Sequence, residues 1–209
     1  MSEFGESNIW TGIEFAVYED EEMLADVQRL VSKDLSEPYS VYLYRYFILT
    51  WPNLCICAFS KDKKTQKRKE MIACVVSKAE METTASDEGL QGYIAMLAVN
   101  ESHRKRGLGL ELVTRSIAEM AKMGCTAVYL EAEKSNKGAL ALYEKLGFIR
   151  EERYGKYYLN GSDAFKLKLY IEANIHALMS TENNSGKKEE EQPGEEQTPD
   201  LDKLKISAK

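Results

Sequence analysis

Three residues that directly follow an apolar run are suited to holding an anion. Arg104, Gly107 and Gly109 form the pattern R-x-x-G-x-G after GYIAMLAV at 92–99. Glycines let backbone N–H groups converge on one point, and the first turn of a helix adds about half a positive charge. The pattern therefore indicates a pyrophosphate cradle, although a basic strand-to-helix turn fits it equally well. It lacks the Gly-Lys-Ser/Thr of a P-loop, and Leu112 replaces the third glycine of a dinucleotide fingerprint.

A second group of polar side chains follows the next apolar run, AVYL. Glu131 and Glu133 are two residues apart, so on a strand they point the same way, and either carboxylate could act as a general base. The pattern N-x-x-A-x-x-x-Y then runs from Asn136 to Tyr143. It places Asn136 at the start of a helix, with Ala139 and Tyr143 on one helix face. Taken alone, a helical tyrosine such as Tyr143 is more often part of a core.

The elements that must position these residues alternate between strand and helix periodicity. We predict strands at 15–19, 54–59, 71–77, 92–99 and 126–132, with an antiparallel pair within 148–158 and 163–172. We predict helices at 20–33, 39–51 and 135–147, the last of them capped by Ser135, and read 104–124 as a glycine turn followed by an amphipathic helix that stops at Gly124. A basic loop at 61–70 and a polar loop at 78–89 are expected to connect strands. Strand–helix–strand crossovers between hairpins are typical of a mixed α/β sheet.

Composition predicts one folded domain with a charged extension. The chain has 209 residues, 44% of them hydrophobic, and a formal net charge of −6. We expect a flexible 1–12, a domain at 13–179 and a disordered tail at 180–209, because the tail has no aromatic residue and contains KKEEEQPGEEQ. The acidic balance argues against bulk nucleic-acid binding. No apolar run approaches the roughly 20 residues of a membrane helix.

The cysteines and histidines favour a reducing compartment and no metal site. Cys55 and Cys57 alternate within an apolar run, which puts them on one face of a sheet. No C-x-x-C pair occurs, and His103 and His176 are the only histidines. The N-terminus lacks the basic and apolar stretches of a secretory signal. We therefore expect reduced packing cysteines and a cytoplasmic protein.

In combination, the two motif groups, which lie within about 55 residues, resemble the GCN5-related N-acetyltransferase (GNAT) family. The resemblance covers roughly 13–172. It implies a GNAT fold, a mixed sheet flanked by helices in which two central parallel strands splay apart to admit acetyl-CoA. The segments LSEPYSVYLYRYF, LEAE and YYLNGSDAFKL further resemble the catalytic subunits of the N-terminal acetyltransferase C (NatC) complex. Those proteins commonly read LETE, so Ala132 is a departure, and we expect it to face away from both glutamates.

The resemblance implies a role for each matched residue. Glu131 would be the general base, alone or with Glu133, and Tyr143 the general acid that protonates the departing thiolate. The residues expected to bind acetyl-CoA are Leu97, Ala98, Val99, Arg104, Lys105, Arg106, Gly107, Leu108, Gly109, Leu110, Asn136 and Ala139. The residues expected to line the peptide slot are Leu35, Glu37, Pro38, Tyr39, Tyr93, Tyr157 and Tyr158.

The implied reaction moves acetyl from acetyl-CoA to the α-amino group of nascent chains that start Met-Leu, Met-Ile, Met-Phe or Met-Trp. Auxiliary NatC subunits and the ribosome would be partners, without nucleic-acid specificity, membrane or metal. A peptide α-amine has a pKa of about 7.7–8.0 and a lysine of about 10.4, a difference of roughly 3.4 kcal/mol, so one carboxylate base suits the α-amine better. Alternatives are a GNAT enzyme for lysine side chains or small amines and a CoA-binding protein without activity.

Overall fold

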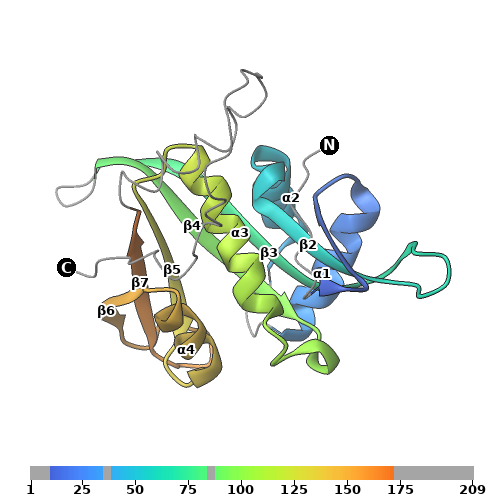
Figure 1. Cartoon of the computed structure of the whole chain (residues 1–209). Helices are drawn as coiled ribbons and strands as arrows, with labels where there is room; N and C mark the ends of the chain where they lie inside the picture. Colours follow the sequence, from blue (N-terminus) through green and yellow to red (C-terminus); the bar gives the residue numbers. More distant parts are fainter. Residues whose placement is uncertain (1–9, 35–38, 84–87, 172–209) are drawn as a thin grey trace, which may run out of the picture.

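The computed structural model describes residues 10–34, 39–83 and 88–171. Its strands are β1 (Ile13–Val17), β2 (Cys55–Lys61), β3 (Arg68–Thr83), β4 (Glu88–Val99), β5 (Ala127–Glu133), β6 (Ile149–Tyr154) and β7 (Ala164–Tyr170). Its helices are α1 (Glu21–Asp34), α2 (Val41–Thr50), α3 (Leu108–Lys122) and α4 (Lys137–Lys145), with short 3-10 turns at Pro52–Leu54 and Glu101–His103. One seven-stranded sheet has the order β1-β2-β3-β4-β5-β7-β6 (Figure 1). The predicted mixed α/β sheet is therefore confirmed.

Each face of the sheet is covered by its own hydrophobic core. One core joins α3 and α4 to the sheet through buried side chains such as Leu112, Val113 and Leu140. The other joins α1 and α2 to the opposite face through side chains such as Val27 and Ile48. Each fully buried aliphatic side chain of this kind stabilises the fold by about 1.5–3 kcal/mol. The two helical layers therefore hold the sheet from both sides.

The four cysteines are packing residues, as predicted. Cys55, Cys57 and Cys74 lie in the core under α1 and α2, and Cys125 lies in the core under α3 and α4. All four are buried and none forms a disulfide. Burial in an apolar environment raises the pKa of Cys125 to about 11. A thiol of this kind stays protonated and unreactive near neutral pH.

The parallel strands β4 and β5 pair only at their beginning and then separate. Their register is Gln91↔Ala127, Gly92↔Val128 and Tyr93↔Tyr129, and β5 pairs along its whole length with β7 instead. On its other side β4 stays paired with β3, where a register shift leaves Ala95 as an extra residue between Ile94 and Met96. Such a bulge bends a strand and reverses which face its side chains point to. The predicted splay of the two central strands is confirmed.

The bulge changes which residues of β4 face each core. Before it, Ile94 lies in the core under α3 and α4, and after it Met96 and Ala98 lie in the opposite core. Leu97 and Val99 consequently pack on the side of α3 and α4. Side chains on a strand alternate between faces, so one extra residue moves every later side chain to the other face.

Two local predictions were wrong. Residues 78–89 are largely strand rather than a polar loop, because β3 and β4 stay paired out to Thr83↔Glu88. The polar composition reflects the exposure of this hairpin arm and did not prevent pairing. Asn136 rather than Ser135 caps α4, since its side chain accepts a hydrogen bond from Ala139 N, while the Ser135 hydroxyl donates to Glu133.

The remaining differences are small shifts in element ends. The first strand begins at Ile13, two residues earlier than predicted. The helix α3 begins at Leu108, directly after the predicted glycine turn. Trp10, which precedes β1, packs edge-on against the ring of Phe15, with the ring centroids 5.6 Å apart.

No helix in the described ranges is long and apolar enough to cross a bilayer.

Candidate active site

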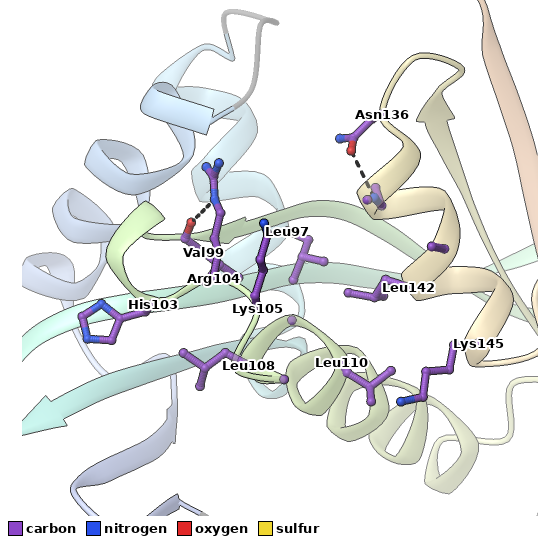
Figure 2. A pocket seen from close by; sticks show the side chains of 15 residues that line it. Leu97, Val99, His103, Arg104, Lys105, Leu108, Leu110, Asn136, Leu142 and Lys145 are labelled. Carbon is purple, nitrogen blue, oxygen red and sulfur yellow. Dashed lines mark hydrogen bonds between the residues drawn. The ribbon is translucent and has the colours of Figure 1, made fainter.

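The glycine turn after β4 leaves the first turn of α3 open to a ligand. Gly107 is the residue before the helix and has a φ of 87°, a left-handed conformation that favours glycine. No side chain caps this helix end. The segment between β4 and α3 is tied to the end of β4, since Arg104 Nε donates a 3.0 Å hydrogen bond to Val99 O (Figure 2). The backbone N–H groups of the first turn are therefore available to an anion.

A cavity of about 680 Å³ lies beside this turn, between α3 and α4. Figure 2 shows its apolar wall, formed by side chains including Leu97, Leu110 and Leu142, and the cationic Lys105 and Lys145. Gly109 allows the two helices to approach, because an added Cβ would lie 3.0 Å from Leu142 Cδ1. The predicted acetyl-CoA-binding residues that line the cavity are Leu97, Val99, Arg104, Lys105, Gly107, Leu108, Gly109, Leu110, Asn136 and Ala139.

Two predicted residues do not line that cavity. The Ala98 side chain is buried in the opposite core, because alternate residues of a strand point to opposite faces. Only the backbone of Ala98 can face a ligand on the side of α3. Arg106 is exposed in the turn between the cavity-lining residues Lys105 and Gly107.

A second, narrower cavity of about 150 Å³ opens where β4 and β5 separate. It shares Leu97, Asn136 and Ala139 with the first cavity, so the two form one continuous cleft. Its lining includes both Glu131 and Tyr143. The cleft therefore joins the glycine turn at one end to Glu131, Glu133 and Tyr143 at the other.

Glu131 is held by tyrosines from two other elements. Tyr93 Oη donates a 2.8 Å hydrogen bond to Glu131 Oε2, and Tyr158 Oη donates a weaker one, 3.4 Å, to the backbone oxygen of Glu131. Burial, followed by the nearby charge of Glu131, raises the pKa of Tyr93 well above its usual 10. Tyr93 therefore remains a hydrogen-bond donor at neutral pH. The sequence analysis assigned Tyr93 only to the peptide slot; the parallel pairing of β4 with β5 is what brings it to the carboxylate.

Glu133 lies in different surroundings although it shares a strand face with Glu131. The Ser135 hydroxyl donates a 2.6 Å hydrogen bond to Glu133 Oε1. This bond, as the largest cause, holds the pKa of Glu133 below its usual range. A carboxylate stabilised in its charged form is a weaker base. Both carboxylates line the narrow cavity, and they differ in their partners, Ser135 for Glu133 and Tyr93 for Glu131.

Tyr143 projects from α4 into the narrow cavity. Its side chain is only 5% exposed and packs edge-on against Phe148, with the ring centroids 5.5 Å apart. Burial raises its pKa well above the usual value of 10. Within the described part of the chain its hydroxyl makes no hydrogen bond, although it borders the cavity. The phenol is therefore protonated and available to a ligand.

Comparisons with known proteins agree with this arrangement. The sequence model of the acetyltransferase (GNAT) family matches residues 24–148. The chain belongs to this family. Within the GNAT family it is similar to N-alpha-acetyltransferase MAK3 of Arabidopsis thaliana, with 49% identity over 157 residues, 75% of this chain and 77% of the relative. It is also similar to N-alpha-acetyltransferase 30 of Xenopus laevis, with 45% identity over 159 residues, 76% of this chain and 55% of that relative.

Solved structures support the same fold. A chain of the NatC complex bound to Gag peptide and CoA matches with a TM-score of 0.71 and 41% identity, over 77% of this chain and 99% of that one. The predicted resemblance to NatC-type GNAT proteins is thus confirmed. The GNAT chain described here spans 55% of the Xenopus laevis relative and 41% of the human one.

The aromatic residues predicted for a peptide slot in this GNAT fold gather only in part. Tyr39 and Tyr158 line the narrow cavity together with Glu131. Tyr157 does not line it; it is 49% exposed, and its ring lies edge-on to that of Tyr158 and stacks on that of Tyr154. Tyr93 reaches the cleft through its bond to Glu131. The predicted slot residues Leu35, Glu37 and Pro38 lie outside the described residues.

The cleft suits an elongated ligand with phosphates at one end and a reactive group at the other. The open helix end and its lysines favour the phosphates, and the apolar wall favours a flexible arm. Among the described residues, no cluster of three or more His, Cys, Asp or Glu side chains is placed to hold a metal ion. The cleft offers backbone N–H groups and cations at one end, and two carboxylates and three phenols at the other.

Proposed function

We propose that this protein is an N-terminal protein acetyltransferase of the NatC type, which transfers acetyl from acetyl-CoA to the α-amino group of chains starting Met-Leu, Met-Ile, Met-Phe or Met-Trp. One observation carries the proposal: a single cleft joins the glycine turn to Glu131 and Tyr143. The names of the relatives and the CoA-bound NatC structure support the same activity.

Acetyl-CoA would lie along the gap left by the separated strands. Its pyrophosphate would meet the N–H groups of the first turn of α3, with Arg104, Lys105 and Arg106 adding positive charge. Its pantetheine arm would run along Leu97, the Ala98 backbone and Val99, towards Asn136 and Ala139. Unpaired backbone groups on β4 could there polarise the thioester carbonyl, the kind of stabilisation that contributes most to acyl transfer.

Glu131 would accept the proton of the incoming α-amine, directly or through a water. The α-amine pKa of about 7.7–8.0 means that little basicity is required near neutral pH. Tyr93 would fix the orientation of the carboxylate through its 2.8 Å hydrogen bond. The neutral amine then attacks the thioester carbon to form the C–N bond, the cationic nitrogen of the adduct loses its second proton to water, and the C–S bond breaks to release the CoA thiolate.

Tyr143 would stabilise the departing thiolate. A thiol of this kind has a pKa of about 8.5, and the pKa of Tyr143 is raised above the ordinary 10 by burial, so full proton transfer to sulfur is uphill by at least about 2 kcal/mol. We therefore infer that Tyr143 acts first as a hydrogen-bond donor to the developing charge. Protonation of the thiolate can be completed as CoA leaves.

Specificity would come from the aromatic side of the narrow cavity. Tyr39 and Tyr158 line it, and a bulky apolar second residue of the peptide would bury its surface against such rings. Leu35, Glu37, Pro38, Tyr93 and Tyr157 are proposed to complete the slot. A lysine side chain would bring a charge to these rings and a less acidic amine to the base.

A peptide panel that varies only the first two residues tests the function. Acetyl transfer is measured on Met-Leu, Ser-Leu and Met-Lys peptides, on a blocked peptide with an internal lysine, and on a free polyamine. We expect Met-Leu to be preferred by at least tenfold. Faster acetylation of the internal lysine or the polyamine would overturn the proposal in favour of an enzyme for other amines.

The matched pair Glu131→Gln and Glu133→Gln tests the base. Loss of a general base costs about 10²–10⁴-fold in rate, so we expect this loss for Glu131→Gln only, with unchanged acetyl-CoA binding by calorimetry. Equal losses in the two variants, or a larger loss at Glu133, would contradict the assignment.

The proposed partners are auxiliary NatC subunits and the ribosome, and the proposed location is the cytoplasm. The NatC structure is by its name that of a complex, and buried cysteines that form no disulfide fit a reducing compartment. We propose the outer face of α2 as the surface for an auxiliary subunit. Its exposed apolar side chains are Val41, Tyr42, Tyr46 and Leu49.

A further inference from the structure

The cations of this protein fall into two classes according to whether a carboxylate neutralises them. Most of the described lysines and arginines form ion pairs, for example Arg115 with Glu111 at 2.8 Å and Lys166 with Glu151 at 2.9 Å. In the described ranges, the lysines and arginines that make no ion pair are Lys33, Lys63, Lys64, Lys67, Lys69, Lys105, Arg106, Lys137, Lys145 and Lys156.

Eight of these ten cations gather in two places. Lys105 and Lys145 line the cavity beside the glycine turn, Arg106 lies in that turn, and Lys137 begins α4 between the cavity-lining residues Asn136 and Gly138, so this group suits the phosphates of acetyl-CoA. Lys63, Lys64, Lys67 and Lys69 lie on the hairpin that joins β2 to β3. All four of the hairpin lysines are exposed. The proposed function accounts for the first group only.

The turn of the hairpin is held by its one acid, Asp62. Asp62 Oδ1 accepts hydrogen bonds from Lys64 N, Thr65 N and Thr65 Oγ1 at 3.0, 2.8 and 3.1 Å. These bonds hold the pKa of Asp62 below its usual range. Backbone bonds between Asp62 and Lys67 and between Gln66 and Asp62, both 2.9 Å, close the turn. The four lysines are therefore presented on an ordered loop.

The acids near the base of the hairpin are engaged elsewhere. Glu14 and Glu19 from the edge of the sheet bind Arg68, at 2.6 and 2.7 Å, and Glu14 also contacts Lys61 at 3.6 Å. Arg68 further lies over the ring of Phe59. Glu14 and Glu19 thus neutralise cations at the base of the hairpin. Within residues 61–70, six lysines and arginines stand against only Asp62 and Glu70, so the hairpin keeps a net positive charge.

We propose that this lysine hairpin is a docking surface for the phosphate backbone of RNA. Lysines that have no carboxylate partner gain most from a dense row of phosphates, because each contact releases counterions. The tip, Lys61 to Lys69, has no aromatic side chain to stack on bases, so the contact reads charge and not sequence. It also has no apolar side chain to insert into a lipid surface, which distinguishes it from a membrane-binding element.

The position of the hairpin is compatible with catalysis on an RNA-bound particle. Figure 1 shows it projecting beyond the β1 side of the sheet, on the opposite side of the molecule from β6 and β7. The cleft between β4 and β5 would therefore stay open when the hairpin is occupied. The acidic net charge of the whole chain limits affinity at high salt and does not remove this local surface.

The test measures binding of the full chain to an RNA duplex as salt is varied, with excess CoA present to occupy the glycine turn. Four phosphate contacts predict a slope of log affinity against log salt of roughly −3. Lys63→Gln/Lys64→Gln should lower affinity at low salt by about tenfold or more and reduce the slope by about 1.5. The control Lys33→Gln/Lys156→Gln removes the same charge elsewhere and should change neither.

Three further measurements decide the outcome. Two duplexes of unrelated sequence should bind within a few-fold of each other, and acetyl transfer to a Met-Leu peptide should be unchanged in the hairpin variant. An unchanged salt slope in that variant, or equal losses in the control, would overturn the proposal. Tighter binding to phosphatidylserine vesicles, or to an acidic peptide, than to RNA would overturn it in favour of that partner. Failure of acetyl transfer in the parent chain would instead count against the proposed function.

Discussion

Single side chains in this cleft differ more in their surroundings than in their chemistry. Glu131 and Glu133 lie two residues apart on β5, yet they have different partners. Glu131 accepts a hydrogen bond from the Tyr93 phenol, and Glu133 accepts one from the Ser135 hydroxyl. Tyr93 and Tyr143 are both buried and both have raised pKa values. Only the Tyr93 hydroxyl is already bonded to a carboxylate. The Tyr143 hydroxyl is the group left for a ligand.

Tyr143→Phe separates a catalytic role from a packing role. The ring still packs on Phe148, and within the described chain the lost hydroxyl had no partner, so the free energy of unfolding should stay within about 0.5 kcal/mol. A hydrogen bond to a developing charge is worth about 1.5–3 kcal/mol, so kcat should fall by roughly 10- to 100-fold with little change in the KM for acetyl-CoA. Steady-state kinetics and urea denaturation measure both quantities.

The opposite pattern would assign Tyr143 to the core alone. A clear loss of stability with kcat unchanged would show that the hydroxyl serves packing and not the leaving group. Tyr154→Phe is the matched control, because Tyr154 lies at the end of β6 and does not line the cleft.

Among the elements, α2 is unusual in being apolar on both sides. Tyr44, Phe47 and Ile48 are buried against the sheet, whereas Tyr42 and Leu49 are 79% and 61% exposed. The positions of Tyr42, Tyr46 and Leu49 differ by four and three residues, so the three side chains share one helix face. Tyr46 Oη donates a 2.7 Å hydrogen bond to Glu80 Oε1, and this bond ties α2 to β3.

Tyr42→Ala/Leu49→Ala tests this face as the auxiliary-subunit surface. Truncating exposed interface anchors typically costs 1–4 kcal/mol in binding, so copurification with co-expressed NatC auxiliary subunits should fall at least tenfold. Acetyl transfer by the isolated chain should not change. The control Met81→Ala alters a side chain that is 68% exposed on β3. Equal losses in the two variants, or none in either, would reject the surface.

Several tyrosines of this molecule have a pKa that burial raises above the ordinary value. Burial raises the pKa of Tyr44 and Tyr129 to about 12. It raises the pKa of Tyr93, Tyr143 and Tyr158 as well. In the unfolded chain these phenols titrate near their ordinary value of about 10. The folded state therefore binds more protons than the unfolded state above that pH.

Stability should consequently fall steeply in alkali. The contribution of these tyrosines is fully present below about pH 10 and is lost as the pH rises towards their folded-state pKa values. Each can lower the free energy of unfolding by up to about 1.4 kcal/mol per pH unit. Urea denaturation at pH 9, 10 and 11 measures the slope. Tyr143→Phe should make it shallower and Tyr42→Phe, at an exposed side chain, should not; an unchanged slope in Tyr143→Phe would contradict the expectation.

The sequence predicted most elements because their signals are local. The apolar run 92–99 indicates a buried strand, Gly107 indicates a turn, and the apolar periodicity after it indicates a helix. The hairpin arm at 78–89 was missed, because its pairing depends on cross-strand partners rather than on apolar alternation. Ser135 and Asn136 are both good caps, and the fold chose between them by giving the Ser135 hydroxyl to Glu133.

The amino-acid sequence alone determined the family, the order of the elements and the identity of the polar groups near the cleft, since motifs and periodicity are properties of neighbouring residues. Only the tertiary structure decided that Tyr93 bonds to Glu131 and that Ala98 faces away from the cleft. These features arise from a brief parallel pairing and a bulge, each of which depends on a neighbouring strand that no local pattern encodes.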